Sequence, residues 1–559
     1  MNRLILAMVL APVLATNAAA NSIQAPKLIL QITVDGLRGD LLRRYGDRFG
    51  DGGFRYLLEN GVVYTNAHYR HANTETIVGH TTLATGAHPS EHGMVGNVIF
   101  DRAKLQLGYN IEDLRSPILP TRSDAQEGTQ VDPAQQRSRV AGRSPRNIKA
   151  STLADELAVH HVGKSKIFGV SGKDRSAIAM AGHSGKAFWF STDTGDFVSS
   201  KYYYDSYHQW AVDWNSKQPA AAYSGKSWTL ANDIDTYLLG TRDDRPYETD
   251  LKGYGRTFPH PYGTTDDGLF NTRIIVSPVG DQLTSDIAMT IIEEEKLGQD
   301  EVTDYLSISF SGVDAVNHFF GPSSLENEEI VLQLDRTLAQ LLEYVDEMIG
   351  LDNVIIALSA DHGMPEAPEF MAELGMKVGR IDPNKIAEEA NRITKQVFGH
   401  DELVLSFFRP YVYLNSKAIA SAGLDQKQVE KVIAEAISNM EGIAQAVSTM
   451  ALPNLQDTPV ISKIRRNTHP ESSGDIYVVQ EPYWFLQEGG ALAVMHGTPW
   501  GYDTYVPIIF AGGGIKPGIV NRLVHPVAVA PTLATLAGIK PPSSAFAEPL
   551  VEVIQHATN

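Results

Sequence analysis

Cysteine is absent from this chain of 559 residues. Its absence excludes disulfide bonds, a thiolate nucleophile, thiolate metal ligands and lipid attachment through a cysteine. Long apolar runs are scarce too. Beyond an apolar stretch near the N-terminus, at Leu4–Leu14, none is long enough to span a bilayer. A membrane anchor is therefore not expected, and any nucleophile or metal ligand must be an oxygen or nitrogen side chain.

Positive charge is also in short supply. The formal net charge is −19 at pH 7, so the surface should repel nucleic acid and anionic lipid. With 43% hydrophobic and 20% charged residues the composition is that of a globular protein. We therefore expect a soluble protein that acts on small molecules and has no nucleic-acid-binding surface. The sequence leaves the oligomeric state open, and a monomer is the simpler expectation.

Residues 1–20 have the pattern of a secretory signal peptide. One cation, Arg3, precedes the apolar run Leu4–Leu14, and Ala18 and Ala20 fit a small-residue cleavage site. The alternative is a buried N-terminal helix. The signal peptide predicts export, and export without disulfides suits a bacterial periplasm or the surrounding medium.

Short apolar runs alternate with helical patterns along most of the chain. The runs that we interpret as strands are Leu28–Val34, Lys166–Ser171, Tyr305–Phe310, Asn353–Leu358 and Tyr505–Phe510. This alternation is typical of an α/β fold with a doubly wound, mainly parallel central sheet flanked by helices.

Two segments depart from that pattern. Residues 101–143 become polar toward their C-terminal end and are interpreted as an exposed insertion, and residues 375–490 are interpreted as an inserted α+β subdomain. The catalytic core would then comprise residues 21–374 and 491–559. Because the second insertion separates two candidate site histidines, we expect it to lie over the site.

Six acidic and histidine side chains lie where a parallel sheet would bring them together. Asp35, Asp314 and Asp361 follow three separate apolar runs, and the carboxyl ends of parallel strands meet at one edge of the sheet. His318 stands four residues after Asp314, and His362 directly follows Asp361. Considered singly, such pairs are more often ion pairs or turns. Together with His496, in a glycine-flanked loop, they offer the mixed nitrogen and oxygen ligands that suit a pair of zinc ions.

A hydroxyl and two cations complete the candidate site. Thr76 stands at the start of a helical pattern, where the helix dipole favours an anion, although threonine at a helix start is often only a cap. Lys173 and Arg175 follow the predicted strand Lys166–Ser171. They are either a solvated turn or a pair of cations for the oxygens of a phosphoryl group.

The motifs occur in the order T-x-x-G-H at Thr76, Gly96-Asn97, K-x-R at Lys173, D-x-x-x-H at Asp314, A-D-H-G at Ala360, and His496-Gly497. In this combination the chain resembles the alkaline phosphatase superfamily, specifically the PafA-type phosphomonoesterases with a threonine nucleophile. The likeness extends over nearly the whole chain after residue 20.

The resemblance implies two zinc ions per chain and a role for each motif. One zinc would be held by Asp314, His318 and His496. The second would be held by Asp35, Asp361, His362 and the Thr76 oxygen. Thr76 would attack phosphorus and carry the phosphoryl group, while Asn97, Lys173 and Arg175 would bind its oxygens. The implied activity is hydrolysis of phosphate monoesters with broad tolerance of the leaving group.

Two alternatives remain open. Zinc phosphodiesterases and nucleotide pyrophosphatases of the superfamily share the metal ligands and the threonine. The pair Lys173 and Arg175 favours the monoesterase, because a monoester has one more anionic oxygen to neutralise. An exported metal- or phosphate-binding protein without turnover is a more distant alternative, and it would not need a nucleophile.

Overall fold

The computed structural model describes residues 25–121, 132–487 and 492–558. The predicted signal peptide, residues 1–20, lies outside the described residues. Within them, no helix has both the length and the apolar character to cross a membrane.

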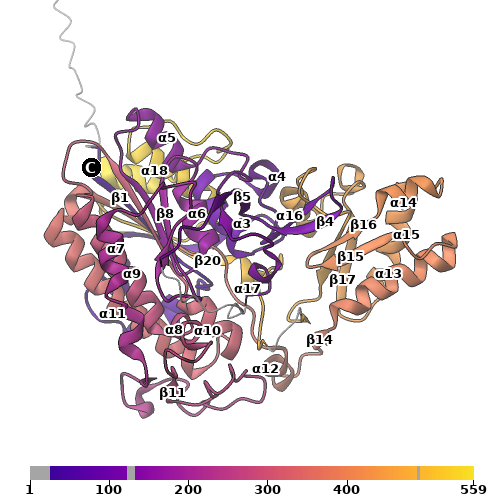
Figure 1. Cartoon of the computed structure of the whole chain (residues 1–559), viewed down its shortest axis with the longest axis horizontal. Helices are drawn as coiled ribbons and strands as arrows, with labels where there is room; N and C mark the ends of the chain where they lie inside the picture. Colours follow the sequence, from indigo (N-terminus) through magenta and orange to yellow (C-terminus); the bar gives the residue numbers. More distant parts are fainter. Residues whose placement is uncertain (1–24, 122–131, 488–491, 559) are drawn as a thin grey trace, which may run out of the picture.

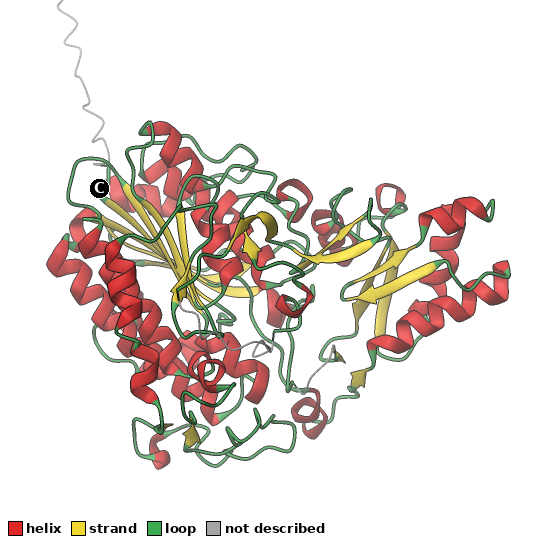
Figure 2. Cartoon of the chain, in the orientation of Figure 1, coloured by secondary structure: helices red, strands yellow, loops and turns green. Residues whose placement is uncertain are grey.

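A nine-stranded sheet forms the centre of the molecule (Figure 2). Its strands lie in the order β21 (Gly518–Val520), β2 (Val62–His68), β20 (Tyr505–Gly512), β13 (Val354–Ser359), β1 (Leu28–Val34), β12 (Asp304–Phe310), β7 (Ile167–Ser171), β8 (Lys186–Phe190) and β9 (Phe197–Val198). The five strands from β13 to β8 are mutually parallel. This confirms the mainly parallel α/β fold.

The middle strand, β1, shows why the sequence folds this way. All seven of its residues are buried, and it pairs in parallel with β12 on one side and β13 on the other. A strand covered on both faces needs a continuous apolar run rather than alternation. The strand predicted at Tyr505–Phe510 is present as β20, but it runs antiparallel to β13.

Helices cover both faces of the sheet (Figure 1). One layer contains α7 (Gln209–Ser216), α9 (Pro278–Glu294) and α11 (Leu325–Met348). The other contains α3 (Thr76–Thr85), α5 (Leu153–His160), α6 (Asp174–Ala181) and α18 (Val529–Leu536). One large hydrophobic cluster joins the sheet to both layers.

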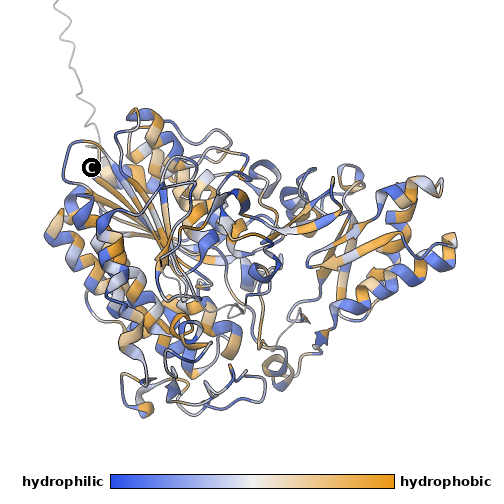
Figure 3. Ribbon diagram, viewed as in Figure 1, coloured by the Kyte–Doolittle hydropathy of each residue, from blue (hydrophilic) through white to orange (hydrophobic). Residues whose placement is uncertain are grey.

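Residues 380–486 build a second, smaller sheet beside the core (Figure 1). Its strands lie in the order β15 (Val404–Phe408), β16 (Tyr411–Leu414), β18 (Ile476–Gln480) and β17 (Ile443–Ser448). Helices α13 (Pro383–Phe398) and α15 (Gln426–Ser438) turn apolar residues toward this sheet and polar ones outward (Figure 3). A separate hydrophobic cluster fills the space between them. The exact domain boundaries stay a prediction.

The segment interpreted as an exposed insertion, residues 101–143, is only partly exposed in its described portion. Tyr109, Asn110 and Ile111 are fully buried, and Arg143 is 8% exposed. The buried phenol of Tyr109 donates to Asp174 on α6, at 2.6 Å. The segment therefore packs against the core next to the site, and polar composition alone did not reveal these contacts. Residues 122–131 of the prediction lie outside the described residues.

Candidate active site

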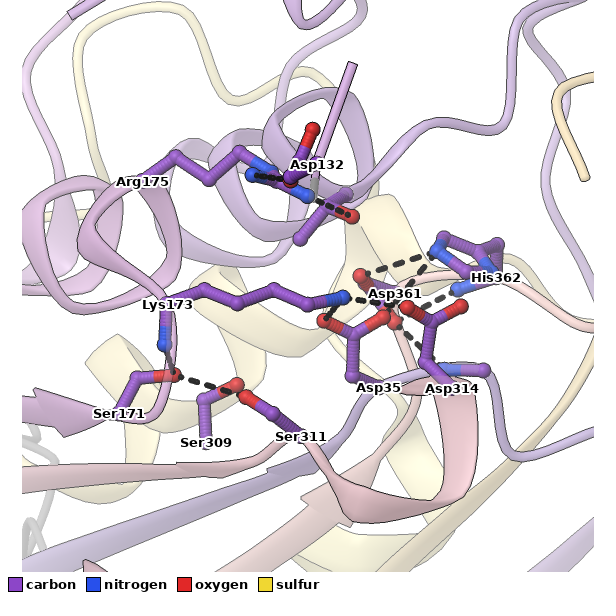
Figure 4. Close-up of polar contacts among 12 residues, drawn as sticks. Asp35, Asp132, Ser171, Lys173, Arg175, Ser309, Ser311, Asp314, Asp361 and His362 are labelled. Carbon is purple, nitrogen blue, oxygen red and sulfur yellow. Dashed lines mark hydrogen bonds and ion pairs between the residues drawn. The ribbon is translucent and has the colours of Figure 1, made fainter. Parts of the chain in front are cut away.

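The candidate ligands lie beyond the carboxyl ends of β1, β12 and β13 (Figure 4). Asp35 follows the last residue of β1, and Asp361 and His362 lie just beyond β13. Strand β12 leads into α10 (Gly312–Phe320), which carries Asp314. All four of these side chains are 0% exposed. The sheet topology thus brings together residues that are more than 300 positions apart in the sequence.

Contacts among these groups are close. The Nε2 atom of His362 lies 3.3 Å from Asp35 and 3.4 Å from Asp361. Asp314 lies 3.2 Å from His318 Nε2 and 3.5 Å from His496 Nε2. Asp314 therefore lies between the two groups of ligands.

Backbone carbonyls hold the three histidine rings in one tautomer. The Nδ1 atoms donate to Gly363 O (His362, 2.9 Å), Val494 O (His318, 3.0 Å) and Thr74 O (His496, 2.7 Å). A carbonyl oxygen can only accept, so each Nδ1 carries the proton. Each Nε2 is then the ring atom turned toward the carboxylates, which is the usual orientation of a metal-ligating histidine.

Several buried atoms of this cluster make no hydrogen bond within the described part of the chain. They are Asp35 Oδ1, Asp314 Oδ1, Asp361 Oδ2 and His362 Nε2. Buried polar atoms that converge without donors are costly unless a cation lies between them. The donor set of carboxylate oxygens and imidazole nitrogens fits zinc. The residues therefore fit the metal pair that the sequence implied.

Two groups of side chains have the spacing to hold an ion each. One is Asp314, His318 and His496, as expected from the resemblance. The other is Asp35, Asp314 and His362, so that Asp314 appears in both. Asp361 was expected in the second group. It lies beside His362, and its Oδ1 accepts from the backbone N–H groups of Gly36 (3.2 Å) and His362 (3.1 Å).

The charges in the cluster are strongly coupled. Burial raises the pKa of Asp35 and Asp314, and Asp314 raises that of Asp35 further. Lys173 and the histidines outweigh these effects, so both pKa values end below the usual value of an aspartate. Burial opposes a charge on His362 as well, but Asp361 and Asp35 raise its pKa to about 9. Both carboxylates are therefore charged at neutral pH and can hold a cation.

Thr76 is the first residue of α3 and is fully buried. The N-cap position belongs to Glu75, and no side chain caps this helix, so the capping interpretation of Thr76 is wrong. The helix lies close against the loop after β13, because a Cβ on Gly79 would stand 2.0 Å from the carbonyl oxygen of Asp361. Only glycine permits that approach, which explains the T-x-x-G spacing.

Asn97 and Arg175 contact the first residues of α3 from other parts of the chain. The Ile77 N–H donates to Asn97 Oδ1 at 3.2 Å, which leaves the amide nitrogen of Asn97 as the donor for a ligand. Arg175 Nη2 donates to Thr76 Oγ1 at 3.4 Å. Arg175 is the second residue of α6, on the far side of the site from β13. Two polar donors thus lie beside the Thr76 hydroxyl.

Lys173 and Arg175 both point into the site, but each contacts a carboxylate there (Figure 4). The Nζ atom of Lys173 lies 2.8 Å from Asp35 and also pairs with Asp314. Burial lowers the pKa of Lys173, but these two carboxylates raise it to a net value above the usual one. The two cations are not a solvated turn. They lie at the end of β7, as the sequence predicted.

Three charged residues near the site were missed by sequence reasoning. Asp132 pairs with Arg175 at 2.6 Å. Glu75 accepts from the Asn97 backbone N–H at 2.6 Å and pairs with Arg409 at 3.3 Å. The one sequence signal for Glu75 was its position directly before Thr76. Asp132 and Arg409 belong to the two segments interpreted as insertions, where no pattern marked them.

A cavity of about 1020 Å³, counted with its open mouth, begins at this cluster. Its polar end is lined by Asn97, Lys173, Arg175, Asp314, His318 and His496. Asp35, Asp361, His362 and Thr76 are fully buried and do not line the cavity. The cavity therefore opens onto one of the two ligand groups, Asp314 with His318 and His496.

Comparisons with known proteins identify relatives of this chain. The family model described as type I phosphodiesterase/nucleotide pyrophosphatase matches residues 29–503. A Myroides odoratus protein described as a calcium-transporting ATPase is 32% identical over 96% of this chain and 96% of its own length. Alkaline phosphatase PafA of Elizabethkingia meningoseptica is 32% identical, over 96% of this chain and 95% of the relative.

A crystal structure of wild-type alkaline phosphatase PafA has the same fold. It superposes with a TM-score of 0.87 at 31% identity, and the match covers 95% of this chain and 100% of that one. A match that covers 95% of this chain is too extensive to leave out either the central sheet or the inserted sheet.

Proposed function

Because the chain belongs to the type I phosphodiesterase/nucleotide pyrophosphatase family of the alkaline phosphatase superfamily, as an alkaline phosphatase of the PafA type, we propose that it hydrolyses phosphate monoesters through a phosphorylated Thr76. The observation that carries the proposal is the position of the Thr76 hydroxyl. It lies at the N-terminus of α3, 3.4 Å from the Arg175 guanidinium and next to a buried Asp/His cluster.

Two zinc ions would be held by the aspartates and histidines of that cluster. Asp314, His318 and His496 would hold one, and Asp35, Asp361 and His362 the other, with Asp314 within reach of both. When bound, such a pair supplies Lewis-acid stabilisation of the entering and leaving oxygens of an in-line displacement. The carbonyl acceptors of the three Nδ1–H groups keep each Nε2 in its ligating orientation.

The first chemical step belongs to Thr76. Its hydroxyl gives up the proton to solvent, a bond forms between Thr76 Oγ1 and phosphorus, and the bond to the leaving oxygen breaks. The leaving alkoxide takes a proton from water. The N-terminus of α3 and the Arg175 guanidinium favour negative charge at this place.

The second step releases phosphate. A water molecule attacks phosphorus, loses a proton to solvent, and the bond to Thr76 Oγ1 breaks, which restores the hydroxyl. Throughout, the Asn97 amide nitrogen and the cations of Lys173 and Arg175 would donate to the outer oxygens of the phosphoryl group. Because these groups are in position before the reaction, little reorganisation energy is needed when negative charge develops in the transition state.

The pair Lys173 and Arg175 favours monoesters over diesters, because two cations reward the additional anionic oxygen. The test compares an aryl phosphate monoester with the matching diester on purified protein whose zinc has been quantified. We expect about two zinc ions per chain and a higher kcat/KM for the monoester. A higher kcat/KM for the diester would establish the phosphodiesterase alternative, and full activity of metal-free protein would refute the mechanism.

We also propose that the protein is exported to a bacterial periplasm or to the surrounding medium after cleavage near Ala20. The support is the charge and apolar pattern of residues 1–20. N-terminal sequencing of protein from a periplasmic extract should begin close to Asn21. Recovery of the uncleaved chain from the cytoplasm alone would refute the proposal.

A further inference from the structure

The cavity in front of the candidate active site is apolar away from its polar end. Its remaining wall is mainly apolar and contains Phe190, Ile275, Val276, Ala315, Phe319, Phe408, Leu492 and Met495, together with the polar side chains of Gln135, Thr192 and Thr272. The apolar side chains come from four different parts of the fold: β8, the end of α8 (Phe270–Ile275), α10 and the inserted sheet with its return segment. An apolar wall assembled from distant segments beside a charged cluster has the features of a ligand-binding site.

Helix α10 joins the apolar wall to one ligand group. Asp314 and His318 are one turn apart and belong to the proposed metal site. Ala315 directly follows Asp314, Phe319 directly follows His318, and both line the cavity. Because residues four apart lie on the same side of a helix, the two pairs form adjacent stripes. The apolar stripe therefore begins where the ligand group formed by Asp314, His318 and His496 ends.

The inserted sheet contributes Phe408, the last residue of β15. Its side chain is 6% exposed, and the Arg137 guanidinium lies 4.7 Å from the centre of its ring. The ring thus lies between the cavity and the segment that carries Arg137. Arg409, the next residue, pairs with Glu75 at the polar end. The insertion and the core together determine the width of the cavity.

We propose that this apolar wall is the binding site of the leaving group, and that the protein prefers phosphate monoesters of apolar alcohols and phenols. The proposal rests on the proposed function. A phosphoryl group bound by Asn97, Lys173 and Arg175 and attacked by Thr76 directs its leaving oxygen away from Thr76, because the displacement is in line. Thr76 lies behind the polar end, so the substituent on the leaving oxygen extends into the cavity, against Phe319 and Phe408.

The preference follows from desolvation. Each methylene that leaves water for an apolar wall contributes about fourfold to binding. A leaving group that carries charges or many hydroxyls would lose hydration against Phe190, Phe319 and Phe408, which have no polar atoms to replace it. Small sugar phosphates and glycerol phosphate should therefore be poorer substrates than aryl and long alkyl phosphates.

The test uses methyl, butyl and hexyl phosphate, because butanol and hexanol leave with nearly the same acidity. On the zinc-loaded enzyme we expect kcat/KM to rise by about two- to fourfold for each added methylene. Phe408→Ala should flatten this rise, and Phe408→Leu should have an intermediate effect. The matched control is Phe407→Ala. Phe407 is the preceding residue of β15, packs on the hydrophobic cluster of the inserted sheet and does not line the cavity.

The outcomes separate this inference from the function on which it rests. If none of the three esters is hydrolysed, the proposed function fails. If all three are hydrolysed with the same kcat/KM, or if Phe407→Ala flattens the series as much as Phe408→Ala, the function stands and the leaving-group site is refuted. Equal zinc content and equal melting temperatures of the variants show that folding is not the cause.

Discussion

The two ligand groups of the site differ in how the fold builds them. Asp35 and Asp361 follow parallel strands of the central sheet directly, and with His362 they are fully buried beneath α3. In the other group, His318 is carried by a helix and His496 by a loop that returns from the inserted sheet, and both line the cavity. The deep group, Asp35, Asp361 and His362, is part of the core, whereas the outer group, Asp314, His318 and His496, lies in the wall of the cavity.

This difference separates two roles. In the proposed mechanism, the deep group lies on the side of Thr76 and would serve the attacking oxygen, with its geometry held by the sheet. The outer group faces the cavity and would serve the leaving oxygen and the substrate. Asp314 belongs to both. We therefore expect changes in the deep group to abolish turnover, and changes around the outer group to alter metal content, stability or substrate binding.

The largest effect is expected from Thr76→Ala, which removes the nucleophile from the deep group. Turnover of an aryl phosphate monoester should fall by at least about 1000-fold. The zinc content, measured by elemental analysis, should stay within a factor of about two, because the aspartates and histidines remain. Thr76→Ser is the matched control and should retain activity. Unchanged turnover in Thr76→Ala would exclude Thr76 as the nucleophile, and absence of turnover in the parent would support a protein that binds metal or phosphate without catalysis.

Asp314→Asn tests whether the two groups share a ligand. The substitution removes a carboxylate that lies against His318, His496 and Lys173, so both ions should bind more than about 100-fold more weakly. Zinc titration after chelation should show two weakened sites, whereas His496→Ala should weaken mainly one. Loss of a single ion in Asp314→Asn would mean that the groups are independent.

Arg409→Met tests the link between the outer region and the start of α3. The guanidinium of Arg409 and the carboxylate of Glu75 are each 4% exposed and 3.3 Å apart. Removing one partner leaves a buried charge uncompensated. The free energy of unfolding, measured in urea, should therefore be about 3–5 kcal/mol lower than in the parent. The double variant with Glu75→Gln should recover most of that loss. No recovery would show that Arg409 acts through its other contacts.

The smallest effect is expected from Asp132→Asn. The Asp132 carboxylate lies 2.6 Å from Arg175, the guanidinium proposed to bind the phosphoryl group. An anion there competes with the substrate, so KM for a monoester should fall by about three- to tenfold while kcat changes little. Asp205→Asn, an exposed acid, controls for the change in net charge. A fall in kcat with unchanged KM would instead make Asp132 a residue that orients Arg175.

The deep group was easier to predict from the sequence than the outer group. The β-rich run Leu28–Val34 predicted β1, and the acid after it could be assigned to the edge of the sheet because the carboxyl ends of parallel strands meet there. The D-x-x-x-H spacing of Asp314 and His318 was readable as one helical turn. His496 had the weakest signal of its own, a glycine-flanked position after the insertion, and was included because of the other candidate ligands and the family resemblance. No local pattern specifies what a loop after an insertion will contact.

Other features depended on tertiary packing and had no sequence signal. Strand β20 is antiparallel to β13 because of the direction in which the chain returns to the core after the inserted sheet. Its own residues would suit a parallel or an antiparallel strand. Asp132 lies in a polar segment whose composition indicated exposure, yet its carboxylate contacts Arg175. Composition averages over a segment, and a single inward contact changes it very little.

The return segment that carries His496 also has a consequence for biosynthesis. The ring of His496 bonds to a carbonyl 422 residues earlier in the chain, so the order in which a ribosome makes the protein matters. A nascent or truncated chain that ends before this point has Thr76 and the deep group but cannot assemble the outer one. Such long-range closure is slow and comes late in folding. The complete site can therefore form only after nearly the whole chain has been synthesised.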